Sequence, residues 1–311
     1  MRRRLLAATL LAAAVPAYVV YVLAGLPPHA QVRALAGKDP GPTSVMRQRE
    51  AEAKSQGRRP RTVQEWIPLA QVSRTLIQAV LASEDQKFFG HEGVDWEAIQ
   101  DSVAANVKNG RAARGGSTIT QQLAKNLFFD TGKSVTRKLR ELIVTRWLER
   151  DLPKVRILAL YLNVIEWGDG IYGCEAAARA YYDKSAADLT PIEAAGLVAM
   201  IPNPRRINPV VSPARFARAQ KRVLWLMASA GYIEKEVAGL GTEPPPEVLE
   251  PEPPPEVLET EPSPEVPETE PSPEVPETEP SPEAPPTEPP PAVPEDGARV
   301  SRHTTCAPAW L

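Results

Sequence analysis

The 311-residue chain is poor in the residues that build disulfide frameworks and metal sites, with only two cysteines and three histidines. Cys174 lies in the body of the chain and Cys306 in its tail, so we expect two free thiols without a structural role. His29, His91 and His303 are far apart in sequence, and no Cys/His spacing resembles a zinc site. The composition therefore excludes a disulfide-rich scaffold and a zinc module.

Charge is absent from Leu5 to Leu26, a stretch that follows the basic start MRRR. As a helix rising roughly 1.5 Å per residue, this stretch would span about 33 Å, enough to cross the hydrocarbon core of a bilayer. A cleavable signal peptide is the alternative, because small residues at 12–14 and Ala17 could form a cleavage site, but the hydrophobic stretch continues to Leu26. We therefore expect an uncleaved transmembrane helix, with residues 1–28 forming a cytoplasmic stub and anchor.

The charges beside this stretch indicate its orientation. Arginines at positions 2–4 favour a cytoplasmic N-terminus, although Arg33 and Lys38 on the other flank weaken the bias. We expect a single-pass protein of the cell inner (plasma) membrane whose body lies on the extracytoplasmic face. Residues 29–61 are expected to be a juxtamembrane linker.

Basic residues are absent from residues 243–296, which consist of six nine-residue units running from EPPPEVLEP to EPPPAVPED. Proline fixes the backbone and removes hydrogen-bond donors, so this segment predicts a semi-extended polyproline spacer rather than a folded domain. We expect residues 241–311 to be a disordered proline-rich tail.

The tail also conceals the charge of the remaining chain. Residues 243–296 hold 17 of the 39 acidic residues and none of the 36 basic ones, so the formal charge of −3 combines this acidic segment with a remainder of the chain at +14. A basic body beside a membrane suits anionic lipids or diphosphate substrates. Because of the expected anchor, we do not expect nucleic acid as a partner.

Alternating apolar runs are also absent, and the periodicity of residues 62–240 is helical. The apolar residues recur three and four positions apart in three stretches, at 76–81, 135–147 and 157–162. Thr190, Pro191 and Glu193 form a capping box with proline at the first helical position, and Gly231 suits the end of a later helix. The sequence predicts one mostly α domain.

A first candidate site lies at EDQKFFGHEGVD, residues 84–95. Glu84 and Asp85 follow the apolar helix face at 76–81, where a helix gives way to a glycine-containing loop. Two solvated carboxylates at a helix end would explain the same pattern. His91 is expected to be structural, because no second ligand or nucleophile is spaced to act with it.

A second candidate site begins at the glycine pair Gly115 and Gly116. Ser117 is expected to be the N-cap of a helix, on which Thr118, Gln122 and Lys125 share one polar face while an apolar face packs in the core. A solvated helix face is the alternative. Free backbone N–H groups at such a helix start attract phosphate, which favours a binding site.

The segment RKLRE, residues 137–141, places two cations near a carboxylate. On a helix Arg137 and Lys138 lie four and three residues before Glu141, so both can approach it and favour its ionised form. An ordinary surface ion pair would explain the same pattern.

With two further segments, KVRILALYLNVIEWGDGIYG at 154–173 and EAAGLVAMIPNPRRINP at 193–209, the chain resembles the monofunctional biosynthetic peptidoglycan glycosyltransferases, whose domain is shared with bifunctional penicillin-binding proteins. The resemblance covers residues 62–235 and rests on five motifs in order, including GGSTITQQLAKNLFF at 115–129. It implies a lysozyme-like, mainly α glycosyltransferase domain that polymerises lipid II into glycan strands with release of undecaprenyl diphosphate.

The resemblance also implies roles for residues. Glu84 would be the general base that takes the proton of the acceptor 4-hydroxyl, and Glu141 the second essential carboxylate. Lys125 and Lys133 match basic positions that would stabilise the departing diphosphate. Motif positions that shape the cleft or orient these groups are matched by Asp85, Ser117, Thr118, Gln121, Gln122 and Arg137.

The same resemblance bears on cofactors and partners. The resemblance allows for a divalent ion, Mg²⁺ or Mn²⁺, at the donor diphosphate near Glu141. It implies no organic cofactor. Lipid II, the growing lipid-linked strand, the membrane, and proteins of cell-wall synthesis or division are the expected partners.

One position departs from the family pattern. The fourth motif often reads ILExYLN, and here Ala159 stands where that glutamate is common. Since the second carboxylate is assigned to Glu141, we interpret Ala159 as the loss of a structural contact.

Two other functions stay open. A lytic glycosidase on a related fold would also use a glutamate but has no need for cations facing a diphosphate. A non-catalytic envelope scaffold would need neither the glutamate nor the cations. A bifunctional enzyme is not supported, because no SxxK motif and no second folded domain follow residue 240.

Overall fold

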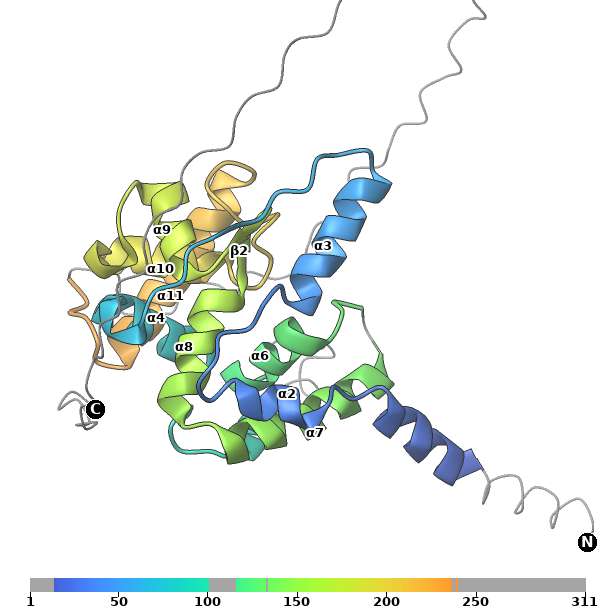
Figure 1. Cartoon of the computed structure of the whole chain (residues 1–311). Helices are drawn as coiled ribbons and strands as arrows, with labels where there is room; N and C mark the ends of the chain where they lie inside the picture. The colour runs from blue at the N-terminus through green and yellow to red at the C-terminus, as the bar shows by residue number, and fades with distance from the viewer. Residues whose placement is uncertain (1–13, 101–115, 133, 237–238, 240–311) are drawn as a thin grey trace, which may run out of the picture. The chain divides into compact units, whose positions relative to one another are not determined.

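The computed structural model describes residues 14–100, 116–132, 134–236 and 239, all within a compact unit that ends at Pro251. The predictions for Lys133, for Cys306 and for the tail fall outside these residues. Helices dominate the described part, so the mainly α prediction is confirmed (Figure 1). The helices are α2 His29–Ala34, α3 Ser44–Ser55, α4 Arg74–Glu84, α6 Ile119–Phe128, α7 Val135–Asp151, α8 Lys154–Val164, α9 Cys174–Tyr182, α10 Pro191–Met200 and α11 Pro213–Ser229, with 3-10 turns η1 Leu69–Gln71 and η2 Ala186–Asp188.

Helix α8 forms the centre of the domain. It is buried on most of its surface, from Ile157 to Val164 with Ala159 half-buried, as expected for a helix that is apolar on nearly every side. It packs against α6 and α7 on one side and α9 on the other, while α4, α10 and α11 pack on one another (Figure 1). The three predicted helical stretches thus correspond to α4, α7 and α8, and each contributes to one core.

The predicted helix ends are correct for α10 and α11 and wrong for α6. Thr190 and Glu193 form the capping box of α10, and Gly231 follows α11 with a φ of 73°. The N-cap of α6 is Thr118 rather than Ser117. The Thr118 hydroxyl accepts from the Gln121 N–H at 3.2 Å and donates to the Gly93 carbonyl at 2.7 Å, so a tertiary contact fixes the helix start one residue later.

A small sheet, not predicted from the sequence, joins two distant segments. Strands β1 Val63–Gln64, β2 Glu166–Gly168 and β3 Ile171–Tyr172 lie in the order β1-β3-β2, with β1 parallel and β2 antiparallel to β3. Strands of two or three residues are too short to show alternation, and β2 and β3 are buried on both faces. Gly170 in their turn has a φ of 70°, and a Cβ there would lie 2.4 Å from the Arg61 carbonyl oxygen.

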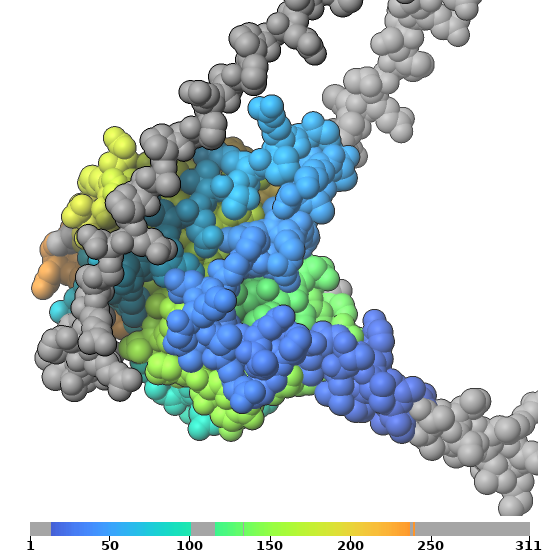
Figure 2. All heavy atoms as spheres, in the orientation of Figure 1, coloured from blue at the N-terminus to red at the C-terminus, as the bar shows by residue number. Residues whose placement is uncertain are grey.

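Residues 29–61, expected to be a linker, contain α2 and α3 instead. Val32 and Leu35 join the main core, and Val45 and Met46 of α3 form a second cluster with Tyr172. Figure 2 shows this blue segment lying across one face of the domain. The many charges of α3 lie outside its buried positions, so its apolar side is narrow and the sequence stretch reads as polar.

The expected transmembrane helix is described only in part. Residues 14–24 are helical, with exposed side chains at Val15, Val20 and Tyr21, and residues 1–13 lie outside the description. Within the described ranges, no helix is both long enough and apolar enough to cross a membrane. The guanidinium of Arg140 donates to the carbonyls of Tyr21 and Val22, which ties the helical segment to α7.

Candidate active site

Glu84 is the last residue of α4, as the sequence predicted, and its carboxylate faces α6. Its Oε2 accepts a hydrogen bond of 2.7 Å from the side-chain amide of Gln122. Burial raises the pKa of Glu84 above its ordinary value, because the charged form loses water; the Gln122 bond and the positive charge of Lys125 oppose this shift. Glu84 is therefore a stronger base than an exposed glutamate.

Gln122 lies between Glu84 and a buried phenol. Its Oε1 accepts from the hydroxyl of Tyr161 on α8 at 3.0 Å, while its Nε2 donates to Glu84. Tyr161 is fully buried, and burial, together with the negative charges of Glu84 and Asp85, raises its pKa well above the ordinary value. One amide thus joins three helices, α4, α6 and α8, at the carboxylate.

Asp85 holds the loop after α4 in place. Its carboxylate accepts from the backbone N–H of Ile119, the first residue of α6, at 3.0 Å, and contacts His91 Nε2 at 2.9 Å. The Nδ1 of His91 accepts from the Gly93 N–H. Burial raises the pKa of Asp85, and the bond and charge of His91 oppose the rise. His91 supports Asp85 rather than reaching Glu84, in agreement with its predicted structural role.

Glu141 lies in α7 with its carboxylate almost fully buried, at 3% side-chain exposure. Arg137 pairs with Oε1, and the ammonium of Lys138 is 3.5 Å from Oε2, as the spacing in RKLRE predicted. The same ammonium donates to Ser117 Oγ at 3.0 Å and to Gln121 Oε1 at 2.9 Å. Lys138 therefore joins the start of α6 to Glu141.

Lys125 lies on α6, near enough to both carboxylates that each acts on its charge. Burial lowers its pKa, and the neighbouring charges of Arg137 and Lys138 act in the same direction, whereas Glu141 and Glu84 both favour its charged form. The arrangement brings a base at the end of α4 together with three cations on α6 and α7. A site of this kind can remove a proton from a hydroxyl and stabilise negative charge that develops nearby.

The structure brings together most of the residues predicted from the sequence. Thr118 is buried, and its hydroxyl bonds the Gln121 N–H and the Gly93 carbonyl at the start of α6. Two residues of the site, Lys138 and Tyr161, were not among the predicted site residues. The position of Lys138 next to Arg137 in RKLRE is a signal for it, whereas Tyr161 lies in an apolar helical stretch whose pattern indicates only a core residue.

The residues present do not fit a metal ion held by protein ligands. Within the described ranges, no group of three His, Cys, Asp or Glu side chains is placed to hold one. The two oxygens of Glu141 already face Arg137 and Lys138. A Mg²⁺ or Mn²⁺ ion at the donor diphosphate would therefore meet a carboxylate that is already paired with two cations.

Ala159, the departure from the expected motif, lies half-buried in α8. Its carbonyl accepts from the side-chain amide of Asn163 at 2.8 Å, and Asn163 also binds both backbone groups of Ile67. Glu141 supplies the second carboxylate of the site from α7, so the alanine does not remove it.

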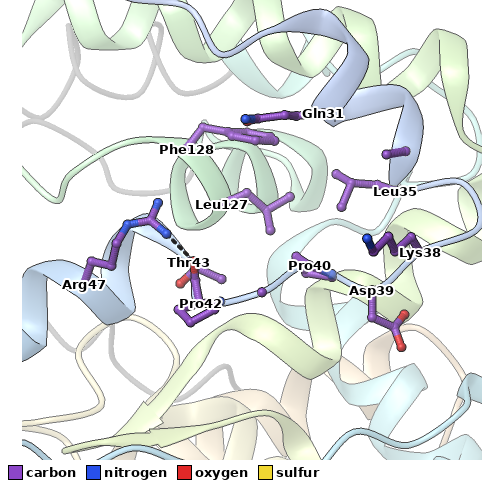
Figure 3. A pocket seen from close by; sticks show the side chains of 12 residues that line it. Gln31, Leu35, Lys38, Asp39, Pro40, Pro42, Thr43, Arg47, Leu127 and Phe128 are labelled. Carbon is purple, nitrogen blue, oxygen red and sulfur yellow. Dashed lines mark hydrogen bonds between the residues drawn. The ribbon is translucent and has the colours of Figure 1, made fainter.

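A separate cavity of about 270 Å³ lies between α2, the connection 35–43 and the end of α6 (Figure 3). Leu35, Leu127 and Phe128 line it, and Arg47 bonds the Pro42 carbonyl at its edge. None of the candidate site residues lines this cavity.

Comparisons with known proteins agree on one family. The family model described as transglycosylase matches residues 48–228, which include most of α3. The chain is 51% identical over 167 residues to the biosynthetic peptidoglycan transglycosylase of Dechloromonas aromatica (strain RCB), covering 54% of this chain and 72% of that one. It is 43% identical over 192 residues to the protein of the same name from Herminiimonas arsenicoxydans, covering 62% and 83%. Identity is 49% over 174 residues with that of Bordetella pertussis (strain Tohama I / ATCC BAA-589 / NCTC 13251), covering 55% and 72%.

Among solved structures, the chain matches penicillin-binding protein 1A from Haemophilus influenzae at a TM-score of 0.32 and 23% identity. This match covers 57% of this chain and 17% of that chain.

Proposed function

The chain belongs to the transglycosylase family and is a peptidoglycan glycosyltransferase, and we propose that it polymerises lipid II into glycan strands with release of undecaprenyl diphosphate. The growing lipid-linked strand is the donor and lipid II the acceptor. The observation that carries this proposal is the pairing of a base of raised pKa, Glu84, with Lys125 one turn beyond Gln122 on α6.

Glu84 acts as the general base. Its carboxylate takes the proton from the acceptor sugar 4-hydroxyl as that oxygen attacks the anomeric carbon of the donor, which inverts the configuration there. The bond from this carbon to the diphosphate oxygen breaks, and the diphosphate keeps the electron pair. A raised pKa improves proton abstraction, because a base is most effective when its pKa approaches the working pH.

The cations around Glu141 stabilise the departing diphosphate. Lys125 is partly buried, so its charge acts where water screens it weakly. The Nε of Arg137 is buried and has no hydrogen-bond partner among the described residues, which leaves one donor for a phosphate oxygen. We assign the same task to Lys133 from its place in the motif. Ser117 and Gln121, both bonded to Lys138, line the donor side.

Glu141 keeps these cations in position. Its carboxylate lies against Arg137 and Lys138 and favours the charged form of Lys125, so it compensates their mutual repulsion before the diphosphate arrives. In the proposed mechanism these protein cations supply positive charge at the diphosphate.

An assay with lipid II separates the three functions considered from the sequence. The purified full chain should convert lipid II into glycan strands that lengthen with time, resolved by gel electrophoresis. Cleavage of preformed glycan without consumption of lipid II would instead identify a lytic glycosidase. No reaction with either substrate would favour a scaffold and contradict the proposal.

We also propose that the N-terminal segment anchors the enzyme in the membrane, with the catalytic domain on the extracytoplasmic face. The uncharged run from Leu5 to Leu26 and the exposed apolar side chains of helical residues 14–24 support this location. The full chain should sediment with membranes and resist extraction by high salt. A chain lacking residues 1–26 should require less detergent to stay in solution; equal sedimentation of both chains would contradict the anchor.

A further inference from the structure

Tyr161 is the only fully buried phenol that the described hydrogen bonds connect to the proposed base. It lies on the central helix α8, and its hydroxyl is 3.0 Å from the Oε1 of Gln122, whose Nε2 is 2.7 Å from Glu84. Resting on the proposed role of Glu84, we propose that Tyr161 is a positioning residue that fixes the amide orientation of Gln122 and, through it, the ionised carboxylate of Glu84.

The chemistry of the three groups sets the direction of both hydrogen bonds. An ionised carboxylate only accepts, so Gln122 must present its NH₂ group to Glu84. The amide oxygen then faces Tyr161, whose hydroxyl must donate. Since the pKa of Tyr161 is raised well above its ordinary value, the phenol keeps the proton that this donation needs.

Tyr161 contributes to this orientation because an amide can turn by half a rotation at little steric cost, and the further contact of Nε2 with the Ser117 carbonyl is long, at 3.5 Å. A hydroxyl that donates to the amide oxygen also polarises the amide and strengthens the N–H bond to the carboxylate. Without the hydroxyl, the amide oxygen would be left unpaired and the reversed orientation would place an acceptor against Glu84. The carboxylate would then hold its negative charge less well.

Other charged groups around Glu84 are accounted for. Lys125 on α6 favours its ionised form, and Asp85, next in the chain, disfavours it. Glu141 of α7 acts on Lys125 rather than on Glu84 directly. None of these groups touches the hydroxyl of Tyr161 in a described hydrogen bond, so removing that hydroxyl changes the orientation of Gln122 and leaves the charges in place.

The test is the pH dependence of kcat/KM for polymerisation of lipid II by the full chain carrying Tyr161→Phe. The acidic limb should move to higher pH by about 0.5 to 1 unit, which corresponds to the loss of one hydrogen bond in the chain to the base. Activity should recover on the alkaline side of the shifted limb. An acidic limb identical to that of the unmodified enzyme would overturn the proposal.

Tyr172→Phe is the matched control. Tyr172 is also fully buried, in the cluster with Val45 and Met46, and its hydroxyl has no hydrogen-bond partner among the described residues, so this variant removes the same atom outside the hydrogen bonds of the base. Its acidic limb should stay in place. A shift as large as that of Tyr161→Phe would show that any buried hydroxyl affects the limb and would overturn the specific role.

A double-mutant cycle shows whether Tyr161 acts through Gln122. Gln122→Leu should move the acidic limb at least as far, and adding Tyr161→Phe to it should move the limb no further. Additive shifts would overturn the proposed route. The activity of Glu84→Gln tests the general base separately. An unchanged acidic limb in Tyr161→Phe together with an inactive Glu84→Gln enzyme would overturn the role of Tyr161 and leave that of Glu84 in place.

Discussion

Replacing Glu84 by glutamine should lower kcat for glycan polymerisation about 1,000-fold, the middle of the range that a positioned general base contributes. Glutamine has nearly the same shape and can still accept the hydrogen bond from Gln122, so the polar region should keep its structure. It cannot take a proton from the acceptor hydroxyl. The measurement is the initial rate of lipid II consumption at saturating substrate.

Glu92→Gln is the control for this variant. Glu92 lies in the loop after α4, its side chain is 79% exposed, and it pairs with Arg146 at the surface. Its replacement changes one charge in the same loop and should leave kcat within about twofold, as expected for a surface ion pair of little energetic weight. A Glu84→Gln enzyme as active as Glu92→Gln would exclude Glu84 as the base.

The Glu84→Gln substitution should also make the protein more stable at neutral pH. Since the pKa of Glu84 is raised in the folded state above the value of 4.5, the folded protein is penalised for ionising it. This penalty is absent below pH 4.5, grows as the pH rises through the folded-state pKa, and is constant above it. The difference in thermal unfolding temperature between Glu84→Gln and the unmodified protein should therefore be absent below pH 4.5, increase as the pH rises through the folded-state pKa, and stay constant above it.

Replacing Glu141 by glutamine should reduce both activity and stability. The variant leaves Arg137, Lys138 and Lys125 near one another without their shared carboxylate. Breaking a buried ion pair by removing one partner costs about 3 kcal/mol, and misplaced cations should lower kcat about 100-fold, because they no longer face the diphosphate. Chemical unfolding and the polymerisation rate measure the two effects.

Glu175→Gln distinguishes loss of activity from loss of stability. Glu175 is equally buried, pairs with Arg179 at the same i,i+4 spacing but with the carboxylate first, and accepts from the Ala186 N–H outside the polar region. Because Arg179 is 54% exposed whereas Arg137 is 17% exposed, this variant should cost less, about 1 to 2 kcal/mol of stability, and it should leave kcat within about twofold. If Glu141→Gln lowered kcat no more than Glu175→Gln did, the proposed role of Glu141 would be wrong.

Much of the fold could be predicted from local patterns. The apolar residues of α4, α7 and α8 recur at helical spacing, and the cap of α10 is formed by residues within four positions of one another, so neighbours in sequence determine these elements. The sheet and the α2–α3 segment could not be predicted in this way. Their stability comes from contacts with distant residues, such as Val63 with Ile171 and Met46 with Tyr172.

In the candidate site, too, some features follow from the local sequence and others from tertiary packing. The sequence by itself determined the helix end at Glu84 and the pairing of Arg137 and Lys138 with Glu141, because a helix places residues three and four apart side by side. Only the tertiary structure decided that Gln122 bonds Glu84 and that Tyr161 bonds Gln122. Those groups lie 38 and 39 positions apart in the chain and meet because α4, α6 and α8 pack together. The pKa of Glu84 follows from that packing, since burial depends on what surrounds a carboxylate and no local sequence pattern contains that information.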